Sequence, residues 1–568
     1  MGKSHVPLLL ERGVYIMNKV KKFFYSQKAA PYVFILPFVL TILLFWIVPI
    51  ANGVLLSFQD VLKEKWVGFN NYSRLISDKM FYKAIYNSVK YMIGTLILLI
   101  PFPMLFASLL NSKLMKGANF FKSVYFLPAL TSVVVAGTIF RLMFGEMDTA
   151  LANQIIGLFG RSPIKWLKGE WTSYFALLLV ACWRWTGVNI LYFLAGLQNI
   201  STDIYEAASI DGATKWQQFI KISFPLLKPT TVYVLTISIY AGLSMFLESF
   251  MLWKGNNSPR NIGLTIVGYL YRQGIEKRAM GYACAVGLVL LIIVMIINMI
   301  QLVATGTFKK RDNMAAEAIG KSQKTKNRVA TVLMVIFFTI LAILIILPIY
   351  AIILASFKPG NHLLQYGLNL DLDSASMTLS NYVLLFTGQH DYWIWFRNSL
   401  FLTVVTVVLT LLVSAFVKYG FAAYDFKGKN FFFVLVLIIL SIPFEVIMLP
   451  LYKQMSTWGL MDSYVAVVLP FLAHASTIFF FRQYLLGTPK SLIEAGRIDG
   501  ATEYGIFFRL IVPILKPAFS AMAILNGMNA WNNYMWPLLV IRSSSKYTLT
   551  IGLNTLINPY GDNYSLLV

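Results

Sequence analysis

Long apolar segments and short polar ones alternate along nearly the whole chain of 568 residues. A helix needs roughly 20 apolar residues to cross the hydrocarbon core of a bilayer, and eleven segments reach about that length. In chain order, these segments lie near residues 31–56, 88–110, 123–144, 173–197, 229–251, 280–304, 330–356, 399–424, 430–450, 463–485 and 518–541. The pattern predicts an all-α polytopic membrane protein.

A polar, basic stretch after the sixth segment divides the chain into two parts. We predict a cytoplasmic N-terminal segment at residues 1–30, a first transmembrane domain at 31–306, a basic cytoplasmic linker at 307–329 and a second transmembrane domain at 330–568. The first domain ends in a sixth apolar segment at Tyr282–Val303, and the second has no counterpart of it. The sequence therefore predicts two tandem six-helix domains, the second lacking its last helix. Truncation, a broken frame or a helix supplied by another polypeptide would each explain this, and we favour truncation.

The start of the chain carries no secretory signal, because the first apolar segment is too long and no small-residue cleavage pattern follows it. Residues 1–16 look unlike anything structural, whereas Met17 is followed by Asn-Lys-Val-Lys-Lys. We hypothesise that translation begins at Met17 and that residues 1–16 are an over-extended reading frame.

Two stretches of the chain, 288 residues apart, have nearly the same sequence. Glu206–Pro229 reads EAASIDGATKWQQFIKISFPLLKP, and Glu494–Pro517 reads EAGRIDGATEYGIFFRLIVPILKP; 12 of the 24 positions are identical without a gap. We call these stretches the first loop and the second loop. Because each precedes the fifth apolar segment of its half, they indicate an internal duplication.

Further residue pairs recur in the same order in both halves, with offsets that drift. They are Ser57-Phe58 with Ser356-Phe357, Asn71-Tyr72 with Asn381-Tyr382, and Asn87-Ser88 with Asn398-Ser399. Shared order with drifting spacing is typical of duplicated halves whose loops have changed independently. If each half has six spans, the repeat is parallel, about an axis along the membrane normal.

The charge of the chain predicts its orientation. The formal net charge is +24, and basic residues cluster at 19–22, 113–122 and 307–328, beside or between apolar segments. Lys and Arg collect in the cytoplasmic loops of membrane proteins, so the charge requires no nucleic acid partner and both loops are predicted to be cytoplasmic. The two cysteines lie in apolar segments and the four histidines lack ligand spacing, so neither a disulfide nor a metal site is predicted.

The residues of the loops predict a short helix after a break. Small residues after the first Glu allow close packing of one helix, and the Asp-Gly pair ends that helix, so that Asp can cap the next one. Trp216, Phe219 and Ile220, like Tyr504, Phe507 and Phe508, then form one apolar face at i, i+3, i+4 spacing. One such helix could rest on lipid headgroups, but two copies at equivalent positions favour docking of a partner.

The loops resemble the signature loop of the permease subunits of ATP-binding-cassette importers. Further stretches resemble the carbohydrate-uptake branch, with two permeases fused in one chain. These stretches are Leu110-Asn111-Ser112-Lys113 and Tyr125-Phe126-Leu127-Pro128 for the first permease, and Pro443-Phe444-Glu445, Pro450-Leu451-Tyr452, Arg482-Gln483-Tyr484 and Trp531–Leu538 for the second.

The resemblance implies a transporter and not an enzyme: a multi-pass protein of the bacterial plasma membrane, driven by two ATPase subunits and supplied with a carbohydrate by an extracytoplasmic solute-binding protein. ATP and Mg would be bound by the partner subunits, because this chain has no phosphate-binding Gly-rich loop of its own and so no expected cofactor. The resemblance implies ATPase docking by Glu206, Ala207, Asp211, Gly212, Ala213, Phe219 and Pro225 in the first loop, and by Glu494, Ala495, Asp499, Gly500, Ala501, Phe507 and Pro513 in the second.

Polar residues inside apolar segments are costly, and this makes them candidates for a solute pathway. The candidates are Trp185, Asn189, Tyr192, Tyr240, Ser244, Glu248, Asn526, Asn529 and Asn533. Asn and Tyr can hydrogen-bond sugar hydroxyls, and a Trp or Tyr ring can lie against a sugar ring. The alternative is that these groups hold helices together or form interfacial belts. For Glu445 and His474 we expect a structural hydrogen bond between the third and fourth spans of the second half.

Two other functional classes remain open from the sequence. A secondary transporter driven by protons or sodium could use Glu248, Glu445 and His474, but it would leave the paired loops unexplained. A scaffold or channel is supported only by the odd number of spans.

Overall fold

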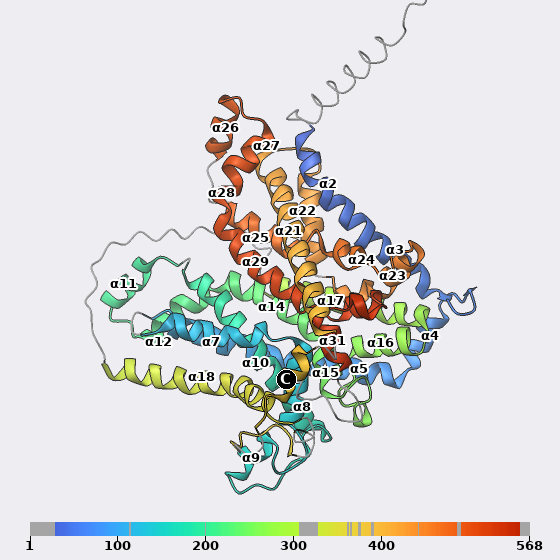
Figure 1. The fold of residues 1–568 in the computed structure, drawn as a ribbon. Helices are drawn as coiled ribbons and strands as arrows, with labels where there is room; N and C mark the ends of the chain where they lie inside the picture. The colour runs from blue at the N-terminus through green and yellow to red at the C-terminus, as the bar shows by residue number, and fades with distance from the viewer. Residues whose placement is uncertain are drawn as a thin grey trace, which may run out of the picture. The chain divides into compact units, whose positions relative to one another are not determined.

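The computed structural model describes residues 29–556, except for 113–114, 199, 306–327, 360–362, 364–365, 373–376, 388–390, 441 and 486–489 (Figure 1). Three predictions therefore lie outside the described residues. They concern the start of translation, most of the basic linker and the absence of a last helix after residue 556.

In the described part of the chain, helices lie at the positions of all eleven predicted segments, and six of them, or ten if each bent pair is one span, meet the length and composition of a membrane span. Six helices are long and apolar enough to cross a membrane: Ala30–Ser57, Lys79–Leu110, Glu170–Gln198, Met280–Ala304, Val329–Ser356 and Tyr392–Phe421. Four bent pairs add Ala118–Met143, Lys215–Leu243, Lys429–Thr457 and Glu503–Trp531, and a shorter apolar helix covers Tyr464–Ile478. The prediction of an all-α polytopic fold is confirmed.

The chain forms two compact units that do not follow the halves of the sequence. Among the described residues, the larger unit comprises those of 53–393, 443–449 and 549–556, and the smaller unit comprises those of 29–52, 394–442 and 450–548. Each unit thus contains the first span of the other sequence half. The predicted sequence boundaries of the domains stay a prediction.

The larger unit is built mainly from α5 to α18, most of which are labelled in Figure 1. Its elements are β1 (Gln59–Asp60), β2 (Lys65–Trp66), α4 (Asn70–Ser77), α5 (Lys79–Leu99), α6 (Pro101–Leu110), α7 (Ala118–Leu130), α8 (Val133–Met143), α9 (Leu151–Gly157), α10 (Glu170–Gln198), α11 (Thr202–Ile210), α12 (Lys215–Gln218), η2 (Phe219–Ser223), α13 (Phe224–Leu226), α14 (Lys228–Leu243), α15 (Leu247–Leu252), η3 (Pro259–Asn261), α16 (Ile266–Tyr271), η4 (Arg272–Glu276), α17 (Met280–Ala304), α18 (Arg328–Ser356), α20 (Ser380–Phe386) and α31 (Leu549–Thr555). β1 and β2 pair antiparallel as a short hairpin.

The smaller unit consists of helices from both ends of the sequence. Its elements are α2 (Ala30–Ile42), η1 (Leu43–Ile47), the first half of α3 (Val48–Ser57), most of α21 (Tyr392–Ala423), α22 (Lys429–Leu440), most of α23 (Phe444–Thr457), α24 (Tyr464–Val468), η5 (Leu469–Phe471), α25 (Ala475–Leu485), α26 (Lys490–Ile498), α27 (Glu503–Ile506), η6 (Phe507–Ile511), α28 (Val512–Ile514), α29 (Lys516–Trp531), α30 (Met535–Val540) and η7 (Ser544–Lys546).

The exchanged first spans are held by specific bonds. In the larger unit, Tyr125 Oη donates to Phe338 O of α18 at 2.7 Å, and Trp183 Nε1 donates to Ile345 O at 2.8 Å. In the smaller unit, Gln454 Nε2 donates to Leu44 O at 2.8 Å. The π-helical turn η1 directs that carbonyl toward Pro49, which has no N–H to donate, so the amide of Gln454 satisfies it.

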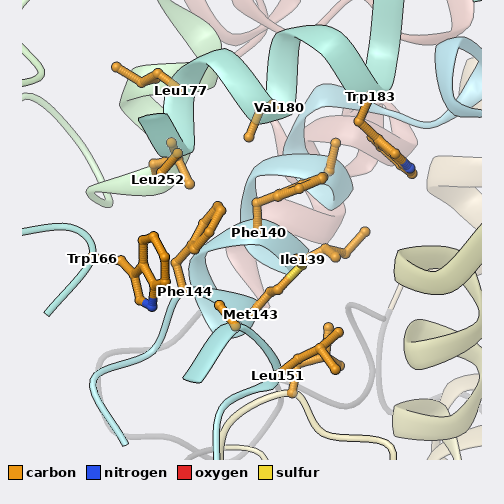
Figure 2. Close-up of a cluster of buried hydrophobic side chains, with 14 of the residues drawn as sticks. Ile139, Phe140, Met143, Phe144, Leu151, Trp166, Leu177, Val180, Trp183 and Leu252 are labelled. Carbon is orange, nitrogen blue, oxygen red and sulfur yellow. The ribbon is translucent and has the colours of Figure 1, made fainter. Parts of the chain in front are cut away.

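A buried apolar cluster forms a core of the larger unit between α8, α10 and α15 (Figure 2). Phe140 of α8 and Phe144, which directly follows α8, point toward Trp183 and Trp166, with ring centroids 5.2 and 5.5 Å apart, and Leu252 of α15 lies near Phe144. This packing fixes α10, which carries several of the candidate pathway residues.

Candidate functional site

The first loop is two short helical stretches joined by a tight turn. Helix α11 ends at Asp211, and Gly212 follows with φ of +80°. Ala213 N donates to Ala208 O at 2.8 Å and Gly212 N donates to Ser209 O at 3.2 Å. This is the Schellman arrangement, in which glycine takes the left-handed position just beyond the helix.

The second loop repeats this turn. Gly500 has φ of +76°, Ala501 N donates to Gly496 O at 3.0 Å, and Gly500 N donates to Arg497 O at 3.1 Å. A Cβ added at Gly212 or at Gly500 would meet no atom within 4 Å, so the glycines serve the backbone conformation and not close packing. The shared Asp-Gly-Ala sequence therefore encodes one turn geometry in both loops.

The prediction that Asp caps the second helix of each loop is wrong. Thr214 is the N-cap of α12, where its hydroxyl accepts from Gln217 N and Gln217 Oε1 accepts from Thr214 N, which forms a capping box. Thr502 caps α27 by accepting from Gly505 N at 3.1 Å. The Schellman turn places Asp211 at the C-cap of α11, three residues before Thr214, too early to reach the N–H groups of the next helix.

The predicted docking residues divide into exposed and internal ones. Asp211 and Asp499 are exposed, as are Gly212 and Gly500, and Glu494 and Ala495 of the second loop. Phe507 is fully buried and Phe219 is partly buried, so these two rings support the loops from within. Pro225 and Pro513 lie in the last helical turns of the loops, just before sharp bends of 67° and 76°.

Two exposed isoleucines accompany the exposed aspartates. Ile210 and Ile498, at equivalent positions just before Asp211 and Asp499, are 62% and 84% exposed. Trp216 of the first loop is 63% exposed. Sequence reasoning missed the isoleucines, although their identity in the two loops was a signal for them. An exposed apolar side chain beside an exposed carboxylate is suited to contact a protein surface.

The interiors of the two loops differ. In the first loop, Gln218 Nε2 donates to Ser209 Oγ at 2.7 Å, and Tyr205 Oη and Ser223 Oγ lie 2.9 Å apart. In the second loop, the position of Ser209 is taken by Arg497, whose Nε donates to Glu503 Oε1 at 2.7 Å. This hydrogen bond raises the pKa of Arg497.

Among the candidate pathway residues of α10, Asn189 has a structural partner. It is buried, and its Nδ2 donates to Leu99 O at 2.7 Å. The helical partner of that carbonyl would be Pro103, which has no N–H, so Asn189 satisfies a group that the break between α5 and α6 leaves open. Tyr192 packs edge-on against Tyr233, and Trp185 lies near the guanidinium of Arg184.

Arg184 forms a buried ion pair that sequence reasoning missed. Its Nη1 lies 3.1 Å from Glu248 Oε1, and the two side chains are 7% and 14% exposed. Nη2 reaches Thr131 O at 3.5 Å, in the break between α7 and α8. The signal was available, because an arginine in the middle of an apolar segment is costly and calls for a partner.

The remaining candidates of the first half are Tyr240 on α14, Ser244 just after it and Glu248, which is the acidic partner in this ion pair. The break after Leu243 separates Ser244, whose Oγ has no partner among the described residues, from Glu248 on α15. Tyr240 and Glu248 each interact electrostatically with Glu445, whose buried Oε2 also lacks a partner in the described part of the chain. Unpaired oxygens near the middle of broken spans are suited to bind hydroxyl groups.

In the smaller unit, the predicted face of three asparagines is divided. Asn526 is buried and exchanges hydrogen bonds with Thr477 of α25, whereas Asn529 is exposed. Helix α29 ends at Trp531, so Asn533 is not on the helix with them. His474 Nδ1 pairs with Ser476 Oγ at 2.8 Å within its own segment.

Comparisons with known proteins agree on one family. The family model described as "Binding-protein-dependent transport system inner membrane component" matches residues 100–311 and 419–568, together well over half of the chain. The arabinooligosaccharides transport system permease protein AraP of Bacillus subtilis (strain 168) is 54% identical over 288 residues, which cover 50% of this chain and 91% of that protein. AraQ of the same organism is 52% identical over 233 residues, which cover 41% of this chain and 83% of that protein.

More distant relatives are also transport permeases. The lactose transport system permease protein LacF of Rhizobium radiobacter is 30% identical over 278 residues, which cover 48% of this chain and 93% of that protein. A crystal structure of a bacterial ABC transporter involved in the import of the acidic polysaccharide alginate matches at 24% identity and a TM-score of 0.44, over 49% of this chain and 96% of that chain.

Proposed function

Because this chain belongs to the family of binding-protein-dependent transport system inner membrane components, we propose that it is the permease of an ATP-driven importer for a sugar or oligosaccharide. The observation that carries the proposal is the pair of loops. Both present the same Schellman turn with an exposed isoleucine, aspartate and glycine at matching positions. Two copies of one surface on one chain fit two copies of one soluble partner.

In this proposal each loop docks on one ATPase subunit, and the ATPases bind ATP and Mg. Closure of the two ATPases on ATP moves the loops, and the attached spans alternate between inward-facing and outward-facing states. A mechanism of this kind requires that each loop moves with helices of the permease. An extracytoplasmic solute-binding protein delivers the substrate, and the chain spans the bacterial plasma membrane several times.

The substrate class follows from the relatives and from the polar residues of the spans. Three of the chain's relatives are named as transport system permease proteins for arabinooligosaccharides or for lactose. In this chain, Ser244, Tyr240 and Glu445 provide hydroxyl and carboxyl groups at broken spans, and hydrogen bonds to these groups suit a polyhydroxylated solute. Asn189 and Asn526 have structural partners, and we assign them to helix packing instead.

A secondary transporter is the alternative, and no observation favours it. Its proton path would use Glu248, which is held in an ion pair with Arg184. Sugar uptake that stops when an uncoupler collapses the proton gradient, while ATP is held constant, would support the alternative.

The test is recovery of the ATPase with the chain. After gentle solubilisation of native membranes, we expect an ATP-binding-cassette ATPase to copurify at about two copies per chain. Asp211→Lys and Asp499→Lys should each reduce that recovery about tenfold, because a lysine replaces an exposed carboxylate on the docking surface. Asp148→Lys, which changes an exposed aspartate of the segment before α9 by the same charge, is the matched control. Equal ATPase recovery from all variants would exclude these loops as the docking sites.

A further inference from the structure

The second loop contains a buried charged network that ties it to another span of its unit. Glu503 is 5% exposed and accepts four hydrogen bonds. Two come from Arg497, from Nε at 2.7 Å and from Nη2 at 3.3 Å. The other two come from the hydroxyls of Tyr419, at 2.8 Å, and Tyr424, at 2.5 Å. Both carboxylate oxygens are therefore occupied.

The two tyrosines that bond to Glu503 lie at the C-terminal end of α21. Tyr419 lies in the last turns of α21, and Tyr424 follows its last residue, Ala423. Arg497 Nη2 also donates to Ala423 O at 3.4 Å, and its guanidinium lies 5.2 Å from the centre of the Tyr424 ring. A cation near the open carbonyls of a helix C-terminus is further stabilised by the helix dipole. The loop is thus bonded to a helix of 32 residues.

An aromatic cluster beneath the network reinforces the connection. The buried Phe507 of η6 stacks on Phe416 of α21, with ring centroids 4.6 Å apart, and packs against Tyr419 at 5.5 Å. Phe34 of α2 lies against Tyr419 at 4.8 Å and Tyr504 at 5.2 Å. The second loop therefore shares one core with the ends of two spans.

The first loop lacks such a network at the matching positions. Ser209 and Lys215 stand where the second loop has Arg497 and Glu503. Lys215 Nζ donates to Gln218 Oε1 at 2.9 Å, and Gln218 in turn donates to Ser209 and to Ala213 O. The hydrogen bonds of Ser209, Lys215 and Gln218 all lie between residues 205 and 218, within the first loop and the residue that precedes it.

We propose that Glu503 and Arg497 are positioning residues that anchor the second loop to α21 by a charged network, so that a displacement of this loop is passed directly to that span. In the first loop, Phe219 packs against the core of its unit, but among the described residues the polar side chains at the matching positions bond only within residues 205–218. The proposal rests on the proposed function, because it assumes that a partner moves the loop. Removal of the Glu503 charge should loosen the second loop without altering its exposed face. The two halves then differ in how movement is transmitted.

A measurement on the chain alone tests the anchor. A spin label is placed at Ile498→Cys in the second loop or at Ile210→Cys in the first, after replacement of Cys182 and Cys284 by alanine, and its mobility is measured in nanodiscs. Both sites are exposed and equivalent. We expect Glu503→Gln to raise the mobile fraction at position 498 several-fold, since it weakens charge-assisted hydrogen bonds, and Lys215→Gln to leave position 210 within twofold. An unchanged spectrum at position 498 would overturn the anchor.

A second measurement tests transmission. With the copurified ATPase and binding protein in proteoliposomes, arabinotriose imported per ATP hydrolysed should fall about tenfold in Glu503→Gln, while ATPase recovery stays within twofold. The reversed pair Arg497→Glu with Glu503→Arg should recover part of the ratio, because the attraction between the two side chains is kept. A mobile loop with an unchanged import ratio would refute transmission and leave the proposed function intact. If the unaltered chain binds no ATPase, the proposed function fails. The mobility measurement still shows whether Glu503 holds the second loop to α21.

Discussion

The two sequence halves are alike where their first spans end and unlike inside the first and second loops. Asn71 Nδ2 donates to Ser57 O at 2.8 Å and to Gln59 O at 3.1 Å. Asn381 Nδ2 makes the same two bonds, to Ser356 O at 2.9 Å and to Lys358 O at 2.8 Å. Tyr72 and Tyr382 each lie 2.7 Å from the serine hydroxyl at the end of the first span of their half.

A second repeated contact ties the start of the second span to the region after the fifth. Asn87 Nδ2 donates to Asn261 O and Leu264 O, at 3.0 and 2.9 Å. Asn398 Nδ2 donates to Ser545 O and Tyr547 O, at 2.9 and 3.0 Å. In each recurring Asn-Tyr and Asn-Ser pair, the asparagine amide therefore donates to two backbone carbonyls near the end of a helix or in a loop. We call these contacts clamps.

The asparagine contacts are repeated and the loop interiors are not, because the two regions place different requirements on the side chains that occupy them. One amide group with two N–H donors, held between two fixed carbonyls, has few substitutes. The interior of a loop instead requires only that its buried hydrogen-bond donors and acceptors satisfy one another. An Arg–Glu–Tyr set and a Ser–Gln set both meet that need, so the loops diverged inside while the turn they present stayed the same.

The largest expected effect comes from removing the cation of the second loop. Arg497→Ser, which introduces the residue of the first loop, leaves Glu503 buried without its opposite charge and should cost about 3 kcal/mol of the free energy of unfolding. The measurement is denaturant-induced unfolding of the purified protein in detergent. A loss below about 1 kcal/mol would mean that the tyrosine hydroxyls alone sustain the carboxylate.

The repeated clamps should give equal effects in the two halves. Asn71→Ala and Asn381→Ala each leave two carbonyls without a donor and should each cost about 2 kcal/mol. The same unfolding experiment should place the two variants within about 0.5 kcal/mol of one another. Unequal losses of unfolding free energy would show that the same hydrogen-bond geometry contributes differently to stability in the two halves.

The contacts of Asp462, in the second half, give a pH-dependent prediction. Bonds from the Ser543 hydroxyl, the backbone N–H groups of Ser543 and Arg542, and Lys546 hold the pKa of Asp462 well below its usual range. A lowered pKa stabilises the fold above the ordinary carboxyl value near about 4, and this contribution is lost as pH falls toward the folded value.

Asp462→Asn should therefore cost about 1 kcal/mol at pH 7. The deficit in thermal stability relative to the unaltered chain should stay constant down to about pH 5 and narrow below about pH 4. A deficit that narrows between pH 7 and pH 6 would assign the effect to another group.

The smallest effect is expected in the first loop. Ser209→Ala removes an exposed hydroxyl that accepts from Gln218, and water can replace it, so the loss should be about 0.5 kcal/mol. Its comparison with Arg497→Ser, at the matching position, measures the difference between the two interiors directly. A loss as large as that of Arg497→Ser would mean that the two interiors are energetically equivalent.

Much of this architecture could be predicted from the sequence. Apolar length located the spans, the repeated loops indicated the duplication, and the resemblance to importer permeases is confirmed by the family match. The length of an apolar segment and the repetition of a loop can be read directly from the sequence, and this is why predictions based on them succeeded. The predicted docking and pathway roles of individual residues stay predictions.

What could not be predicted depends on partners far along the chain. Asn189 was a candidate for the pathway, but its amide is committed to Leu99 O because Pro103 lacks an N–H. Arg184 was overlooked because Glu248, its partner, lies 64 residues away. The aspartate caps failed for a local reason instead, since a glycine in the left-handed conformation displaced the cap to the following threonine.

The exchange of first spans has a consequence for biogenesis. Residues 29–52 belong to a unit whose other parts are residues 394–442 and 450–548, so α2 is held by partners that are synthesised much later than α2 itself. Until more than 300 further residues have followed, α2 must wait beside the translocation site or in lipid with its buried face, including Phe34 and Phe38, unfilled. Contacts of such long sequence separation close slowly, which makes this span a step where insertion machinery or a membrane chaperone would control the yield of folded protein.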